Sequence, residues 1–309
     1  IKLSILFTLI WLLVVPFSED FFNSHTLFPF LVFTPVWVSL MLKAWDGGYL
    51  EGSLKFTWLA VLTLVAAFSK LLFSVIFVTF GLEHLVYAAG PISLFLGFCG
   101  GWIVARKIAH QNTDTTTKPS RANMRFSRAF LATATIAKVS SISFLSLDLI
   151  FVKHFLTATE AGEYALLVLV GRIIYIVGGF SSQFILPIIS KESGEGIKKS
   201  KSFKIIMLSV IVSTLLVFLM VGPLGSTTIP LLFGNNALPI TPYLTPFALA
   251  MVLFTIAYSL VTYHQARKEY AFSLIGIVTA IVQFLFLYLF HSNIGQVVSG
   301  MLLSGAFYL

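Results

Sequence analysis

The sequence consists largely of uninterrupted apolar runs, each close to the twenty residues that a helix needs to cross a bilayer. We locate ten such runs, at residues 1–15, 27–42, 57–80, 85–105, 129–152, 163–187, 205–222, 242–262, 271–290 and 296–309. Only a helix satisfies its own backbone hydrogen bonds in lipid over segments of this length. The runs therefore predict an all-α polytopic membrane protein with about ten transmembrane helices in two lobes.

The composition agrees with this interpretation and excludes several kinds of site. The chain has 309 residues, of which 58% are hydrophobic and 10% are charged, whereas a soluble domain is about one quarter charged. Its single cysteine excludes a disulfide within the chain and a cysteine-based zinc site. There is no glycine-rich phosphate loop, metal-spaced histidine pair or nucleophile elbow. We therefore expect a non-enzyme without cofactor or metal.

The basic residues alternate between the connections. Sixteen of the twenty Lys and Arg residues fall on one predicted side of the membrane: Lys2, Lys43, Lys55, Arg106, Lys107, Lys118, Arg121, Arg125, Arg128, Lys191, Lys198, Lys199, Lys201, Lys204, Arg267 and Lys268. The connections of the other side carry only Lys153. The positive-inside rule places the sixteen in the cytoplasm. The net charge of +8 thus indicates topology and contact with membrane lipids, and not nucleic-acid binding.

The longest connection, 106–128, is polar and threonine-rich, and we interpret it as a cytoplasmic linker between lobes 1–105 and 129–309. A shift of 214 residues superimposes the first four runs on the last four, with "YLEGSLKF" at 49–56 on "YHQARKEY" at 263–270. The repeat predicts two six-span halves related by an axis along the membrane normal. Two spans of the leading half are then missing, and because the chain begins and ends within apolar runs we expect a fragment of a longer protein.

Three cations, Lys70, Lys138 and Arg172, lie well inside apolar runs. Each costs roughly 2.5–3.5 kcal/mol at a helix centre, so a partner or a hydrated cavity is required. Asp148 is the one acid that could face them, but its place near the outer end of a run suggests pairing with Lys153 or His154. The membrane interior then keeps a net positive charge, which suits an anionic ligand such as a phosphate or pyrophosphate.

Two alternatives for these cations stay open at this stage. Lys138 shares a helical face with Ser141 and Leu145, and this polar stripe predicts either a hydrated cleft or a Ser/Thr-lined helix contact. In the second case Lys138 would bind backbone carbonyl groups. Lys70 could instead extend its stem toward an interface.

Several segments resemble the polysaccharide flippases of the multidrug/oligosaccharidyl-lipid/polysaccharide exporter superfamily. The stretch 146–190 carries Asp148 before an apolar run, Phe155-Leu156, "EAGEYA" at 160–165 and "LPIIS" at 186–190. Segments 231–256 and 47–56 are similar to two connections of that family. The resemblance covers nearly the whole chain, as spans three to twelve of twelve or fourteen, and rests on order and spacing.

The resemblance implies a flippase in the cytoplasmic membrane of a bacterium or archaeon. Such a protein moves undecaprenyl-diphosphate-linked oligosaccharide to the outer leaflet by alternating access, in the synthesis of surface polysaccharide such as the O-antigen of lipopolysaccharide. The cationic cavity of the family corresponds here to Lys138, Arg172 and Lys70 as substrate-binding residues. The resemblance leaves a coupling ion, the glycan and the oligomeric state open.

Two other functions are weighed against the flippase. A multidrug cation antiporter of the same superfamily needs embedded acids to bind cationic drugs, and the sequence places none at mid-span. A membrane glycosyltransferase or polysaccharide polymerase needs acidic residues in an outer loop, and Glu19-Asp20 is the only acidic pair there.

Overall fold

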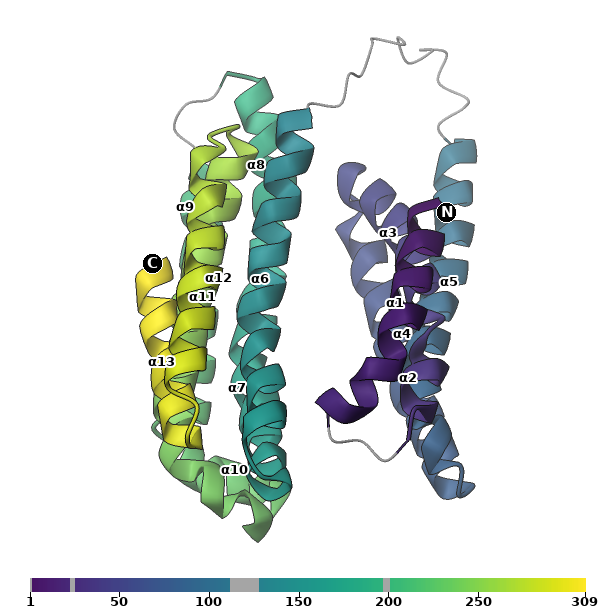
Figure 1. Cartoon of the computed structure of the whole chain (residues 1–309). Helices are drawn as coiled ribbons and strands as arrows, with labels where there is room; N and C mark the ends of the chain where they lie inside the picture. The colour runs from purple at the N-terminus through teal and green to yellow at the C-terminus, as the bar shows by residue number, and fades with distance from the viewer. Residues whose placement is uncertain (1, 23–25, 112–127, 197–200) are drawn as a thin grey trace. The chain divides into compact units, whose positions relative to one another are not determined.

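The computed structural model describes residues 2–22, 26–111, 128–196 and 201–309, and every regular element among them is a helix (Figure 1). They belong to two compact units, Ile1–Ala122 and Asn123–Leu309. The division falls within the predicted linker 106–128, most of which lies outside the described residues. Residues 106–111 of that linker continue a helix and do not form a loop.

The N-terminal unit is built around one long helix that packs against two others. Its elements are α1 (Lys2–Phe21), α2 (Phe28–Phe33), α3 (Val36–Gly52), α4 (Phe56–Thr79), the 3₁₀ helix η1 (Glu83–Ala88) and α5 (Ala89–Gln111). Both α3 and α4 pack along α5. Pro35 separates α2 from α3 and occupies the N-cap position of α3, where its missing N–H group costs little.

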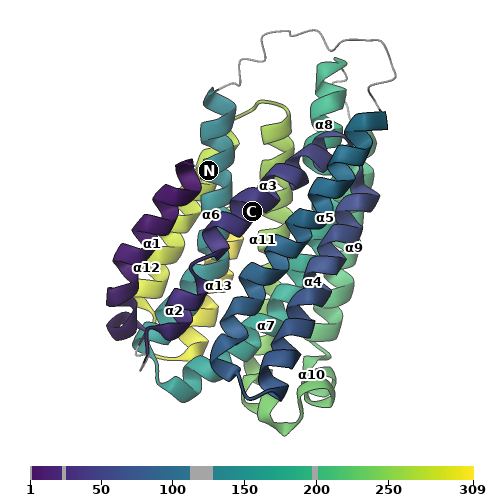
Figure 2. The ribbon, with the colours of Figure 1, turned by 90° about the vertical axis from the view of Figure 1, so that its right-hand side faces the viewer.

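The C-terminal unit contains the longest helices. Its elements are α6 (Arg128–Phe155), α7 (Ala158–Ser182), α8 (Ile185–Gly194), α9 (Lys201–Val221), α10 (Gly225–Phe233), the 3₁₀ helix η3 (Asn235–Ile240), α11 (Thr241–Ala266), α12 (Ala271–Leu289) and α13 (Ile294–Tyr308). Pro187 explains the break between α7 and α8, because it lacks the N–H group that would bond Gln183. The short helices α8 and α10 lie at opposite ends of this unit (Figures 1 and 2).

Eight helical segments of the described chain are long and apolar enough to cross a membrane, which supports a multi-pass membrane protein. Two shorter apolar helices, Ser4–Ser18 and Ile294–Tyr308, coincide with the first and last predicted runs. The prediction differs from the structure at several connections. Helix α3 continues beyond the predicted end at residue 42, so Lys43 lies within it, and the predicted outer connection 223–241 contains α10 and η3. The structure also has helix in other predicted connections, including 188–204, which α8 enters.

Helix α11 is the centre of the C-terminal unit, since it packs against α7, α8, α9 and α13. The rings of Phe144 on α6 and Phe254 on α11 are stacked with their centroids 4.1 Å apart. Glycines let α7 approach this core closely. A Cβ atom at Gly178 would lie 2.4 Å from Thr214 Cγ2 and 2.7 Å from Thr255 Cγ2, while a Cβ atom at Gly179 would meet nothing within 4 Å.

Two helix ends agree with the predicted internal repeat. Leu54 and Lys268, 214 residues apart, are the two non-glycine residues with positive φ in the described chain, at 55° and 64°. Each follows a helix end closed by the same bond, from Lys55 N to Leu50 O and from Glu269 N to His264 O, both at 2.9 Å. The packing also corresponds, since α3 and α4 contact α5 as α11 and α12 contact α13.

The turn after α11 carries an ionic cluster that His264, near the end of α11, forms with Arg267 and Glu269. Glu269 contacts His264 Nδ1 at 2.6 Å and Arg267 Nε at 3.2 Å. The hydrogen bond with His264, followed by the charges of His264 and Arg267, lowers the pKa of Glu269. A lowered carboxyl pKa stabilises the turn above the ordinary pKa of Glu, and this contribution is lost as the pH falls through the lowered value.

The neighbouring glycines of α7 give a matched test of the helix packing. We expect Gly178→Ala to lower the free energy of unfolding by about 1–3 kcal/mol, because the new methyl group must displace two threonines. Gly179→Ala should be neutral or stabilising by up to about 1 kcal/mol, since alanine favours the helix. Thermal unfolding of the purified protein in detergent measures both, and equal melting temperatures would contradict this packing.

The shared helix end gives a second test. Leu54→Gly and Lys268→Gly should each stabilise the protein by about 0.5–1 kcal/mol, because glycine adopts positive φ without the steric cost that other residues bear. Gly196, with φ +79° and open space around its Cβ position, is the control. Gly196→Ala should lower the free energy of unfolding by a similar amount. A lower melting temperature for Leu54→Gly or Lys268→Gly would argue against the positive φ at these turns.

Candidate functional site

The hairpin between α6 and α7 brings two embedded ionisable residues, Asp148 and Arg172, together. Its short connection ends in a capping box, in which Thr157 N donates to Glu160 Oε2 at 3.1 Å and Glu160 N donates to Thr157 Oγ1 at 3.4 Å. A capping box satisfies two free backbone donors and fixes where the helix starts. The start of α7 therefore determines which of its residues face α6.

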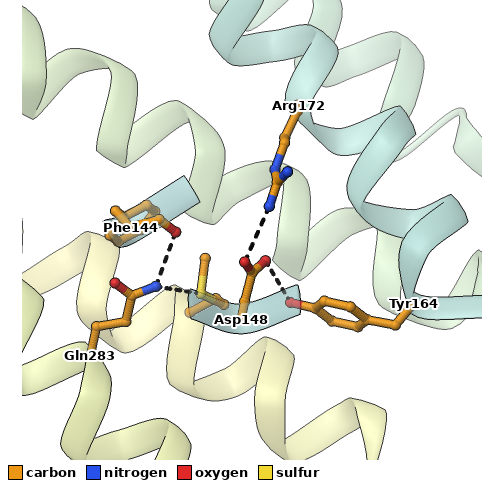
Figure 3. A network of polar contacts seen from close by, with 6 residues as sticks. Phe144, Asp148, Tyr164, Arg172 and Gln283 are labelled. Carbon is orange, nitrogen blue, oxygen red and sulfur yellow. Dashed lines mark hydrogen bonds and ion pairs between the residues drawn. The ribbon is translucent and has the colours of Figure 1, made fainter. Parts of the chain in front are cut away.

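Asp148 of α6 receives two side-chain contacts from α7 (Figure 3). Arg172 Nη2 donates to Asp148 Oδ1 at 3.1 Å, and the Tyr164 hydroxyl group donates to Asp148 Oδ2 at 2.9 Å. Both carboxylate oxygens are thus satisfied, as a buried charge requires. The expectation that Asp148 pairs with Lys153 or His154 is wrong, because the arginine side chain extends toward it from deeper in α7.

The two partners differ in burial. The side chain of Asp148 is 0% exposed and that of Arg172 is 25% exposed. Arg172 uses one of its five N–H groups on Asp148, and its buried Nε has no partner among the described residues. The opposite charges of the two residues offset each other. A quarter of the Arg172 side chain remains exposed.

A glutamine joins a third helix to the same region of α6. Gln283 Nε2 of α12 donates to the backbone oxygen of Phe144 at 3.0 Å and contacts Met301 Sδ at 3.1 Å (Figure 3). Phe144 lies one turn before Asp148, so α12 is tied to α6 next to the ion pair. Gln283 was missed in the sequence, although a lone amide within an apolar run was a visible signal.

Lys138 lies on the exposed face of α6 and has no side-chain partner among the described residues. Leu131, Val139 and Ile142 around it are each more than half exposed. Ser141, by contrast, is 1% exposed. Lys138 and Ser141 of the predicted polar stripe therefore lie in different surroundings. The neighbouring Ser140 packs toward α12, where a Cβ atom at Gly276 would lie 3.0 Å from Ser140 Oγ, and this contact matches the predicted Ser/Thr helix contact.

The other embedded charges lie in the N-terminal unit. Lys70 is exposed on α4 and also has no described side-chain partner. A second ion pair joins Lys43 Nζ to Asp46 Oδ2 at 3.0 Å within α3, and Asp46 is completely buried. The sequence interpretation places Lys43 in a connection and does not identify Asp46. Their i, i+3 spacing at the end of an apolar run was the available signal.

These positions correct one premise of the sequence interpretation. Arg172 is neutralised by Asp148, so it does not contribute a free positive charge to the membrane interior. Lys70 and Lys138 keep their charges unpaired within the described chain. The two buried carboxylates of the described residues, Asp46 and Asp148, each contact a cation.

No protein-family model, no curated protein and no solved structure gives a significant match to this chain.

The asymmetry of the Asp148–Arg172 pair leads to a stability prediction. Arg172→Gln should cost about 3–5 kcal/mol, because it leaves a fully buried carboxylate without its cation. Asp148→Asn should cost less, since the partly exposed guanidinium group can be hydrated and Tyr164 can still donate to the amide oxygen. The double variant should recover most of the loss.

Thermal unfolding in detergent of the four proteins measures this coupling. Lys138→Gln is the control, because it removes an embedded cation that has no described partner, and its melting temperature should stay near that of the unmodified protein. Additive losses in the double variant would show that the two residues do not stabilise each other.

Proposed function

We propose that this protein is a non-enzymatic flippase of undecaprenyl-diphosphate-linked oligosaccharide, acting by alternating access in the cytoplasmic membrane of a bacterium or archaeon. In this proposal it serves the synthesis of surface polysaccharide, such as O-antigen, as part of a fold with twelve to fourteen spans. Lys138 carries the proposal as the cation that binds the diphosphate, with Lys70 and Arg172 as further substrate-binding residues.

The supporting observation is the placement of Lys138. It lies ten residues after the start of α6, about 15 Å along the helix, which is half the thickness of the hydrocarbon core. A lysine at this depth costs roughly 2.5–3.5 kcal/mol. No described carboxylate offsets that cost, so an anionic ligand is a physically suitable partner.

Arg172 has a modified role in this proposal. Its pairing with Asp148 anchors the guanidinium group between α6 and α7, and its remaining N–H groups could donate to a phosphate. Lys70 and Lys138 would supply the uncompensated charge. The repeat of helix ends and packing supports two related halves, which is an architecture that suits alternating access.

The rival functions receive less support. A multidrug cation antiporter needs an embedded acid that is free to bind a cation, and both buried described carboxylates are already paired. A glycosyltransferase or polymerase would rely on Glu19 and Asp20. These two residues lie at the end of α1, and their side chains lie outside the described part of the structure.

The test uses the full-length protein in cells that lack their own copy. Lys138→Ala should reduce surface polysaccharide at least tenfold at unchanged protein level, because the diphosphate loses its counter-charge. Lys138→Arg should restore most of the export. Surface polysaccharide is measured by antibody binding, and the membrane level of the protein by immunoblotting.

Two controls separate binding from folding. Thr135→Ala changes the same exposed face one turn away without altering charge, and Lys153→Ala removes a cation from the end of the same helix. Both should export normally. Normal export by Lys138→Ala at normal protein level would refute the proposal.

A further inference from the structure

The N-terminal unit contains an apolar cavity of about 460 Å³ between three of its helices. Its walls include Ile5 of α1, Val38, Met41 and Trp45 of α3, and Phe98 and Trp102 of α5. The volume falls within the range of small-molecule sites, which is roughly 300–1,000 Å³. Ser4 is the single polar residue of the lining, so a sugar or another strongly polar ligand would lose its hydration without replacement.

The character of the walls suits a flexible hydrocarbon chain. Three aromatic rings supply broad apolar surface, and the unbranched side chain of Met41 can adapt to an irregular ligand. Trp45 and Trp102 lie in the second halves of α3 and α5. Both helices lead to connections of the basic, predicted cytoplasmic side, where tryptophans are typical of the membrane interface.

A cation is fixed beside this cavity. The guanidinium carbon of Arg106 lies 3.8 Å from the centroid of the Trp102 ring, and Arg106 follows Trp102 by about one turn of α5. The Arg106 side chain is exposed, so its N–H groups can bind an anion at the level of the lipid headgroups. Cavity and cation thus provide a half-open apolar groove with a positive charge next to its aromatic wall.

We propose that this cavity binds one acyl chain of an anionic phospholipid from the cytoplasmic leaflet, with the lipid phosphate on Arg106. The charge complementarity between Arg106 and an anionic headgroup selects this occupant, and the cytoplasmic leaflet is the one rich in such lipids. The site is separate from Lys138, Arg172 and Lys70. It depends on the membrane topology alone, so it stands or falls independently of the flippase proposal.

Tryptophan fluorescence can test the site directly. The full-length protein would keep Trp102, with the other tryptophans of this chain, Trp11, Trp37, Trp45 and Trp58, changed to Phe. It would be reconstituted in vesicles of phosphatidylcholine and phosphatidylglycerol in which either lipid carries brominated acyl chains. Brominated phosphatidylglycerol should quench Trp102 several-fold more strongly than brominated phosphatidylcholine at the same mole fraction.

Matched variants identify the cation responsible. Arg106→Gln should bring the ratio of the two quenching constants close to one, whereas Lys107→Gln, which removes the adjacent exposed cation, should leave it unchanged. A variant that keeps Trp58 alone reports on α4, outside the cavity, and its ratio should not respond to Arg106→Gln. Equal quenching of Trp102 by the two lipids, or an Arg106→Gln variant with the original ratio, would overturn the proposal.

Protection of Trp102 from both brominated lipids would also overturn it, because protein would then fill the cavity. If the tryptophan replacements impair folding, native mass spectrometry of the protein with all its tryptophans provides a second measurement. Phosphatidylglycerol should remain bound to the unmodified protein and be lost several-fold more readily from Arg106→Gln. Equal retention would contradict the site.

Discussion

The need to neutralise a carboxylate in an apolar interior organises the C-terminal unit. Asp148 has no exposed surface, so its two oxygens take donors from Arg172 and Tyr164, which both lie on the next helix. This requirement sets the rotation of α7 against α6, and the capping box at Thr157 sets its start. Gln283 then ties α12 to the same part of α6, so three helices meet around one buried charge.

The same rule separates two kinds of embedded cation. Lys43 and Arg172 lie beside buried carboxylates, and removing either would leave a charge without compensation. Lys70 and Lys138 lie on exposed helix faces and have no described side-chain partner. Their cost is not offset within the described chain, and for this reason the proposed function assigns an anionic ligand to them, whereas the paired cations lie at helix contacts.

Much of the helical architecture could be predicted from the sequence, because crossing a bilayer imposes a length and a polarity that can be read locally. The repeat was also visible, and the positive φ values of Leu54 and Lys268 show that the offset of 214 residues joins equivalent helix ends. The sequence interpretation was wrong about local details at the ends of the apolar runs. Helix α3 continues through Lys43 and Asp46, and these two charges pair with each other, which a count of apolar residues cannot detect.

The sequence by itself determined the helical class, the approximate spans and the alternation of basic connections, and it predicted a repeat with which two helix ends agree. Each follows from periodicity, length or charge along the chain. Only the tertiary structure decided which embedded charges are paired, because partners such as Asp148 and Arg172 lie 24 residues apart and meet through helix rotation and side-chain reach. It also decided that Lys138 and Ser141 face different surroundings, since burial depends on which neighbouring helix covers each face of α6.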